Sequence, residues 1–411
     1  MFLHHGEFVD VRMRGFSERT DVDVLLTLID RRIGCLPSES VDIRHAAGRV
    51  LAESVRSAVN VPAFHRSAMD GYAVAADNTP GEFTIVGQVF PGRPFDGVVE
   101  TGEAIAIMTG APLPAGVDCV VPVEQVELSH GRVTVSKSSA PGKHVGLCGE
   151  DITAGERVLS AGRMLRPQDL GMLASIGVAQ VRVVRRPRVA VFVTGNELVE
   201  CGKPPDEFRI VDSNSIMLAT LLERDGAEMG QMVMLEDRQE VIRAALTACE
   251  ADLVVVTGGS SVGLEDFAPS IVAELGELLV HGVNMRPAAP LGFGFIKDRP
   301  VFLLPGNPVS CLCAYDVVVG RAVRRLGGRP IDSPYRIETL PLAEKLPSIE
   351  GRVYYVRVLV DSGKVHPLKS AAGSGASILS GACRADGYVL VPKETSALNQ
   401  GECVTVYFYD R

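Results

Sequence analysis

Acidic side chains occur in the short polar turns that follow several apolar segments of this 411-residue chain. The stretches "HRSAMDGYAV", "GEDITAGE", "VTGNEL" and "VGLEDF" contain Asp70, Asp151, Glu197 and Asp266. Carboxylates at one site would repel a phosphorylated ligand unless a divalent cation bridges them, and oxygen-rich sites of that kind suit Mg²⁺. Two further acids, Asp212 and Asp237, begin helical segments, where helix capping is the simplest interpretation.

Glycine-bearing turns end three of the apolar segments, at 194–197, 257–263 and 305–308. Glycines let backbone N–H groups approach an anion closely, and a helix N-terminus adds positive potential. One such turn would be an ordinary strand-to-helix connection, but three in succession indicate a common binding rim. None of them is a Walker loop or a GxGxxG motif, so the familiar nucleotide-binding signatures do not explain them.

The elements that must position these turns lie between residues 178 and 330, where apolar strands alternate with helical patterns. Strands that are apolar on both faces and joined by helices predict a largely parallel sheet covered on both sides. Ligands of such sheets bind at the carboxyl ends of the strands. The residues alone therefore predict an α/β domain that binds a phosphorylated small molecule together with Mg²⁺.

Elsewhere the chain is rich in β-strand patterns. Residues 17–34 predict an amphipathic helix, residues 55–149 a turn-rich β module, and residues after 328 a small β barrel or sandwich. The net charge of −9 argues against general nucleic-acid affinity. No stretch approaches the ~20 apolar residues that span a bilayer, and the N-terminus lacks a secretory pattern, so we expect a cytoplasmic protein.

Several longer stretches resemble the MoeA family, the molybdopterin molybdenumtransferases, which include the E domain of gephyrin. They are "PAFHRSAMDGYAV", "IMTGAPLPAGVDCVVPVEQV", "GEDITAGERVLSAG", "VTGNEL", "TGGSSVGLEDF" and "LPGNPVS", in the family's order over nearly the whole chain. The resemblance implies a multidomain α/β plus β fold in a homodimer whose clefts are shared between subunits. Its four domains would be an elongated linker domain in two segments, an inserted β domain, a molybdopterin-binding α/β domain and a C-terminal β barrel, at 12–54 with 150–177, 55–149, 178–330 and 331–411.

The reaction that the resemblance implies is Mg²⁺-dependent insertion of molybdate into adenylylated molybdopterin, with release of AMP. Catalytic positions of the family match Asp70, Thr109, Asp151, Glu197 and Asp266. Metal ligands would come from Asp70, Glu197 and Asp266, with Asp237 aligned less securely. The pterin phosphate would be bound by Gly258, Gly259, Ser260 and Ser261. The pocket floor would be formed by Pro305, Gly306, Asn307, Pro308 and Ser310. The oxyanion would be bound by Arg286 and Arg357. Other proteins of cofactor biosynthesis are the further partners implied.

One turn departs from the family pattern. Where the family usually has Lys-Pro-Gly-Lys-Pro, this chain has Arg286-Pro287-Ala288-Ala289-Pro290. Arg286 keeps the first cation, whereas Ala289 replaces the second lysine and Ala288 replaces the glycine. Three hypotheses follow: a working transferase with a retuned oxyanion site, a divergent paralogue that cleaves or binds the pterin with altered (tungstate) preference or poor insertion, and a non-catalytic dimeric scaffold.

Overall fold

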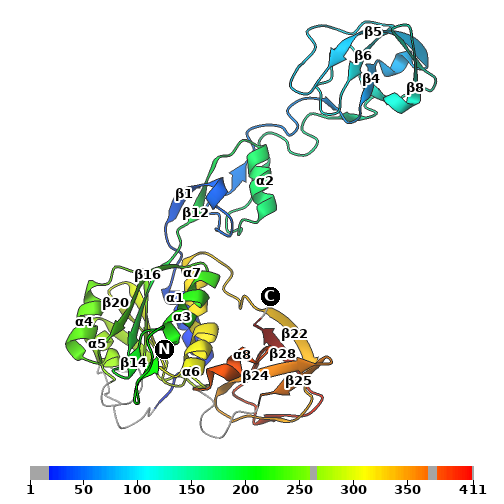
Figure 1. Ribbon diagram of the computed structural model, residues 1–411. Helices are drawn as coiled ribbons and strands as arrows, with labels where there is room; N and C mark the ends of the chain where they lie inside the picture. The colour runs from blue at the N-terminus through cyan, green and yellow to red at the C-terminus, as the bar shows by residue number, and fades with distance from the viewer. Residues whose placement is uncertain (1–17, 260–265, 369–376, 410–411) are drawn as a thin grey trace. The chain divides into compact units, whose positions relative to one another are not determined.

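The computed structural model describes residues 18–259, 266–368 and 377–409. The described chain forms two compact units, which are treated separately below (Figure 1). One contains residues 18–39 and the described residues from 184 onward, and the other contains residues 40–183. Ser260 and Ser261 of the predicted phosphate cradle lie outside the described residues.

A six-stranded sheet with the strand order β16-β13-β17-β21-β20-β18 forms the centre of the first unit. The first four strands are parallel, whereas β20 and β18 run antiparallel to their neighbours, so the predicted parallel-rich sheet is confirmed with an antiparallel edge. Its elements are β13 (Arg188–Thr194), β14 (Leu198–Val199), β15 (Ile210–Val211), α3 (Asn214–Arg224), β16 (Glu228–Leu235), α4 (Gln239–Ala248), β17 (Leu253–Thr257), α5 (Ala268–Leu275), β18 (Glu277–His281), β19 (Met285–Arg286), β20 (Gly292–Ile296), β21 (Arg299–Leu304), α6 (Pro308–Ala314), the π-helical segment η4 (Tyr315–Val319) and α7 (Gly320–Leu326).

Both faces of this sheet are covered, as the apolar strands predict. Along β13, Val189, Val191 and Val193 pack into one core with α3, α6 and α7, while Ala190 and Phe192 pack into the opposite core with α4 and α5 (Figure 1). This alternation follows from the two-residue repeat of a strand. A sheet buried on both faces leaves its strand ends as the place where polar turns reach solvent.

Helix α1 (Val22–Arg32) confirms the predicted amphipathic helix. It packs against the α/β unit, however, and not in the linker domain. The resemblance implies that residues 12–54 belong to the linker domain as one segment. Instead, α1 buries Leu25 and Ile29 in the same core as β13 and α7, and residues 18–39 belong to the α/β unit. The apolar face of a lone helix shows that it must be buried, but not against which sheet.

The C-terminal residues form a small barrel, as predicted. The strands follow the order β24-β26-β28-β22, β25 pairs with β24, and a bridge between Leu342 and Val365 connects the two ends into a ring. Strand β19, which lies between β18 and β20 in the chain, extends this sheet by pairing with β24. The elements are β22 (Arg336–Pro341), β23 (Leu346–Pro347), β24 (Val353–Asp361), β25 (Lys364–Pro367), α8 (Leu379–Cys383), β26 (Gly387–Val391), β27 (Ala397–Leu398) and β28 (Cys403–Phe408).

The second unit is built mainly of short strands. A six-stranded sheet with the order β7-β4-β6-β5-β9-β8 forms its β module, and a separate core around Leu51, Leu165 and Leu173 holds the segments that flank this module. The elements, including those at the junction, are β1 (Ser38–Asp42), η1 (Ile43–His45), β2 (Val55–Arg56), β3 (Arg66–Ser67), β4 (Gly71–Val74), η2 (Ala76–Asn78), β5 (Gly81–Val89), β6 (Glu103–Ile107), β7 (Cys119–Pro122), η3 (Val123–Gln125), β8 (Val126–Ser129), β9 (Arg132–Val135), β10 (Val145–Gly146), β11 (Arg157–Leu159), α2 (Pro167–Ser175) and β12 (Gln180–Val184).

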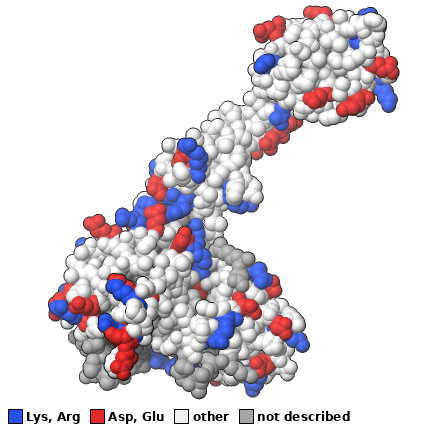
Figure 2. Space-filling model, viewed as in Figure 1, with Lys and Arg blue, Asp and Glu red and all other residues white. Residues whose placement is uncertain are grey.

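The surface carries charges of both signs. On the face shown in Figure 2, lysine and arginine side chains are interspersed with aspartate and glutamate over the described parts of both units. Neither sign of charge forms a continuous patch over the described residues on this face. Among the described helices, none combines the length and the apolar character needed to cross a membrane.

Candidate functional site

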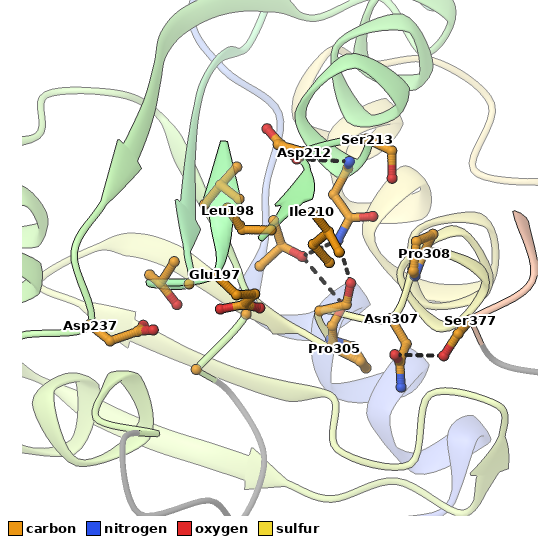
Figure 3. Close-up of a pocket in the computed structure, with 18 of the residues that line it drawn as sticks. Glu197, Leu198, Ile210, Asp212, Ser213, Asp237, Pro305, Asn307, Pro308 and Ser377 are labelled. Carbon is orange, nitrogen blue, oxygen red and sulfur yellow. Dashed lines mark hydrogen bonds between the residues drawn. The ribbon is translucent and has the colours of Figure 1, made fainter. Parts of the chain in front are cut away.

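A cavity of about 1030 Å³ lies at the carboxyl ends of β13, β17 and β21 (Figure 3). The three glycine-bearing turns that follow these strands all line it, as does the segment 210–214 at the start of α3. Ser377 and Leu379 of the C-terminal domain also line it. The structure therefore brings together the three turns that the sequence places at one rim, because parallel strands end on the same side of a sheet.

Four carboxylates of the described residues line this cavity: Glu197, Asp212, Asp237 and Asp266. No lysine or arginine is among the described residues of its wall. An anion entering such a cavity meets the negative charge of these carboxylates, and this repulsion costs more free energy in a partly dehydrated site than in water. The cavity therefore suits either a cationic ligand or an anion that enters with a divalent cation.

Asp212 caps helix α3, as the simplest interpretation predicted. Its Oδ1 accepts hydrogen bonds from the backbone N–H groups of Asn214, at 2.9 Å, and Ser215, at 3.2 Å. Asp212 is buried, and its Oδ1 is occupied by the first turn of the helix. These bonds are those of a helix cap, whereas Glu197, which also lines the cavity, is exposed.

Asp237 does not cap helix α4, so the capping interpretation is wrong for this residue. Its Oδ2 accepts from the backbone N–H of Asn196 at 3.0 Å, and its own N–H donates to Asn196 Oδ1 at 3.2 Å. This reciprocal pair connects the turn after β16 to the turn after β13. The remaining oxygen, Oδ1, is buried and has no hydrogen-bond partner among the described residues. A carboxylate oxygen in that state suits a metal or a bound donor.

Asn214 holds the floor of the cavity together and was not predicted as a site residue. Its Nδ2 donates to Thr257 Oγ1 at 3.1 Å and to the carbonyl oxygen of Gly306 at 2.8 Å. One buried amide thus connects the start of α3 to the turns after β17 and β21. The polar run "DSNS" between a strand and a helix is the only local feature that could have pointed to Asn214. Capping by Asp212 already explains such a run, so it did not identify Asn214 as a site residue.

Gly258 is required by the close approach of two neighbouring turns. Its φ is +87°, and a Cβ placed on it would lie 2.1 Å from the carbonyl oxygen of Thr194. Any other residue would push the turn after β17 away from the turn after β13. The predicted cradle glycines Gly258 and Gly259 both lie in the cavity wall, and the contact with Thr194 excludes a side chain at position 258.

The turn from Pro305 to Pro308 lines the cavity and leads into α6. Asn307 is exposed there, and its Oδ1 accepts a hydrogen bond from the Ser377 hydroxyl at 2.9 Å (Figure 3). Ser310 lies one turn further along and is buried in the helix. Of the predicted floor residues, Pro305, Gly306, Asn307 and Pro308 thus line the cavity, whereas Ser310 does not.

The turn that departs from the family pattern reaches the cavity only through Pro290. The Arg286 side chain is exposed, and its guanidinium lies 5.6 Å from the centre of the Tyr354 ring. Ala289 is half-buried, and its carbonyl oxygen accepts from the N–H of Val283 at 2.8 Å. Ala288 is buried and has a φ of +85°. At position 288, where the family usually has glycine, the backbone is therefore left-handed, and glycine adopts this conformation without strain.

We expect Ala288→Gly to change the free energy of unfolding by less than about 1 kcal/mol, because release of about 1–2 kcal/mol of left-handed strain offsets the loss of a buried methyl group. Ala322, buried in α7, is the matched control. There, Ala→Gly should cost about 2 kcal/mol, since helix propensity and burial are both lost. Urea titrations of both variants would measure this, and equal losses would contradict the assignment of strain to Ala288.

Arg357, on β24, lies outside the described lining of the cavity but next to a segment that borders it. Its Nη1 donates to the carbonyl oxygen of Ile378 at 3.0 Å, and Ile378 lies between the lining residues Ser377 and Leu379. The half-buried guanidinium thereby holds this segment in place. That Arg286 and Arg357 bind the oxyanion remains a prediction.

The other predicted catalytic residues belong to the second unit. Asp70 Oδ1 accepts from both the backbone N–H of Thr109, at 2.6 Å, and its hydroxyl, at 2.8 Å. These two bonds lower the pKa of the Asp70 carboxyl below its usual value, so the group is charged at neutral pH. Asp151 is exposed in the turn before β11. The structure thus joins Asp70 with Thr109 within one unit.

Comparison with known proteins agrees with this architecture. The family descriptions that match are the MoeA N-terminal region (domains I and II) over residues 20–177, a probable molybdopterin-binding domain over 190–325 and the MoeA C-terminal region (domain IV) over 339–409. A molybdopterin molybdenumtransferase of Haemophilus influenzae is 33% identical over 380 residues, which cover 90% of this chain and 93% of that protein. Molybdopterin molybdenumtransferase 2 of Mycobacterium tuberculosis is 35% identical over 78% of this chain and 83% of its own length.

Among solved structures, the molybdopterin biosynthesis MoeA protein of Pyrococcus horikoshii is similar to this chain with a TM-score of 0.84 and 31% identity. The match covers 96% of this chain and all of that one. Three family regions in the expected order and full-length relatives above 30% identity lead to one conclusion: the chain belongs to the MoeA family.

Proposed function

We propose that this protein is a molybdopterin molybdenumtransferase, which inserts molybdate into adenylylated molybdopterin and releases AMP in the cytoplasm. The observation that carries the proposal is the cavity itself. Three strand-end turns meet there, at a glycine that allows two of them to approach closely. Its described lining contains several carboxylates and no lysine or arginine. A phosphorylated ligand that brings a divalent cation fits this combination, and the relatives named above are molybdopterin molybdenumtransferases.

Glu197, Asp237 and Asp266 are the residues that would hold Mg²⁺. The buried, unpartnered Oδ1 of Asp237 fits a metal ligand. No cluster of three or more metal-binding side chains is close enough to enclose an ion by itself within the described ranges. This also fits Mg²⁺, which keeps several waters and takes further oxygens from substrate phosphates. When bound, the ion would neutralise phosphate charge, while the backbone of Gly258 and Gly259 and the turn at Asn307 orient the ligand.

Asp70, Thr109 and Asp151 are proposed to act in a homodimer, where they would face the cavity of the other protomer. Two apolar side chains beside Asp70 support an interface there: Met69 is 38% exposed, and Val123, whose N–H donates to the Asp70 carbonyl oxygen, is 46% exposed. Mixing inactive Asp70→Asn and Asp266→Asn proteins after unfolding and refolding tests this. Shared clefts should restore about a quarter of the sites, because heterodimers contain one intact cleft. No recovery would contradict the shared cleft.

The proposed oxyanion site predicts that Ala289→Lys lowers the molybdate concentration required for half-maximal insertion by about ten- to a hundredfold, since a charge-assisted hydrogen bond is worth roughly 1.5–3 kcal/mol. Titrating metal insertion with molybdate in both proteins measures it. Lys297, exposed in the turn after β20, provides the control site, where Lys297→Ala should leave the titration unchanged. An unchanged molybdate dependence in Ala289→Lys would contradict this interpretation of the turn.

The function itself is tested by incubating the protein with adenylylated molybdopterin, Mg²⁺ and graded molybdate or tungstate. AMP release with metal insertion supports the proposal. AMP release without insertion of either metal would identify the divergent paralogue that the changed turn allows. Absence of both AMP release and pterin binding would overturn the proposal in favour of a scaffold.

A further inference from the structure

A buried carboxylate connects the α/β domain to the C-terminal barrel. Asp316 lies in the π-helical segment η4, between α6 and α7, and its side chain is completely buried. Burial raises the pKa of Asp316 to about 6, although Arg224 and two tyrosine hydroxyls act in the opposite direction. A buried charge costs free energy compared with an apolar residue of similar size, so the groups that hydrogen-bond to Asp316 decide what this carboxylate does in the fold.

The partners of Asp316 come from separate parts of the chain. Its Oδ1 accepts from Tyr335 Oη at 2.9 Å, and its Oδ2 accepts from Tyr355 Oη at 3.1 Å. Both tyrosines belong to the C-terminal segment, and Tyr355 lies on β24. Arg224 Nη1 lies 3.5 Å from Oδ1 and donates to the Tyr335 hydroxyl. The carboxylate thus uses both oxygens to hold the barrel against one helix.

The same helical run contacts the C-terminal domain a second time at the cavity. Asn307 precedes α6, and its side chain accepts from Ser377. Nine residues separate Asn307 from Asp316, which corresponds to about 13 Å along a helix. Two contacts at that separation, together with the pairing of β19 with β24, restrict the orientation of the neighbouring domain as well as its position. Ser377 and Leu379, which complete the described cavity wall, depend on that orientation.

We propose that Asp316 is a positioning residue: its hydrogen bonds to Tyr335 and Tyr355 orient the C-terminal domain so that Ser377 and Leu379 form their part of the cavity wall. Asp316 does not reach the cavity, so it acts on the ligand only through this wall. The activity measurements below rest on the proposed transferase function, whereas the exchange measurement does not.

Tyr355→Phe is the most informative variant, because it removes one hydroxyl and leaves the stacked ring in place 4.2 Å from that of Tyr388. We expect about a tenfold rise in KM for adenylylated molybdopterin with kcat nearly unchanged, since the wall binds the ligand without acting on the reacting atoms. Tyr335→Phe should behave similarly, and Asp316→Leu should combine both effects if it folds. Tyr409→Phe is the matched control, because its hydroxyl contacts Tyr355 but not Asp316.

Hydrogen exchange provides the second measurement. Peptides covering residues 377–383 should exchange faster in Tyr355→Phe and Tyr335→Phe than in the wild type, while peptides from β17 stay protected. If the wild type releases no AMP, the transferase proposal fails and the exchange result alone decides the role of Asp316. Unchanged KM and exchange in both tyrosine variants, or equal changes in Tyr409→Phe, would overturn the inference.

Discussion

Glu197→Gln should reduce AMP release by about ten- to a hundredfold, since the loss of one interaction with a charged group costs roughly 1.5–3 kcal/mol. Glu197 is exposed in a cavity whose described wall contains carboxylates and no lysine or arginine. Removing its charge weakens the attraction for Mg²⁺, so half-maximal activity should also require more Mg²⁺. Initial rates of AMP release at graded Mg²⁺ concentrations measure both effects.

Glu200→Gln is the control for this prediction. Glu200 is exposed three residues further along the chain, just after β14, where it pairs with Lys203 at 2.6 Å, and it is not among the residues that line the cavity. Its replacement removes the same charge and should leave the rate and the Mg²⁺ requirement close to those of the wild type. Equal effects of the two substitutions would mean that general charge, rather than a cation site at Glu197, controls the reaction.

Asn214→Asp should destabilise the α/β unit by about 2–4 kcal/mol, because it buries a charge and replaces a donor that two acceptors use. In the wild type, Asn214 Nδ2 donates to Thr257 Oγ1 and to the Gly306 carbonyl oxygen. In the variant, a carboxylate oxygen faces that carbonyl oxygen and repels it. Scanning calorimetry should therefore show a lower transition temperature, and AMP release should fall because the floor of the cavity loses its connection.

Asn307→Asp provides the same chemical change at an exposed position of the same cavity. There the bonded atom of the wild-type side chain is Oδ1, which accepts from Ser377, so the variant keeps its acceptor. We expect its transition temperature to stay near that of the wild type. If Asn214→Asp were equally mild, the proposed connection of three elements by the Asn214 amide would be wrong.

Much of the fold could be predicted because it depends on local patterns. The apolar runs at 188–194 and 253–257 are strands, and the alternation of strands and helices predicts a sheet with its polar turns at one rim. Capping by Asp212 was also predictable, since it involves residues two and three positions away. The packing of α1 was not predictable, because an amphipathic pattern does not identify its partner.

In the candidate site too, some features could be predicted from the sequence and others only from the structure. The sequence by itself determined the three rim turns and the resemblance to the MoeA family, because short-range residue order carries both. The tertiary structure alone decided that Asn214 bonds to groups 43 and 92 residues away, that Ala288 has a left-handed backbone, and that Asp316 meets Tyr335 and Tyr355. Hydrogen bonds between distant segments exist only after the sheet and barrel have packed, so no periodicity or motif around one partner predicts the other.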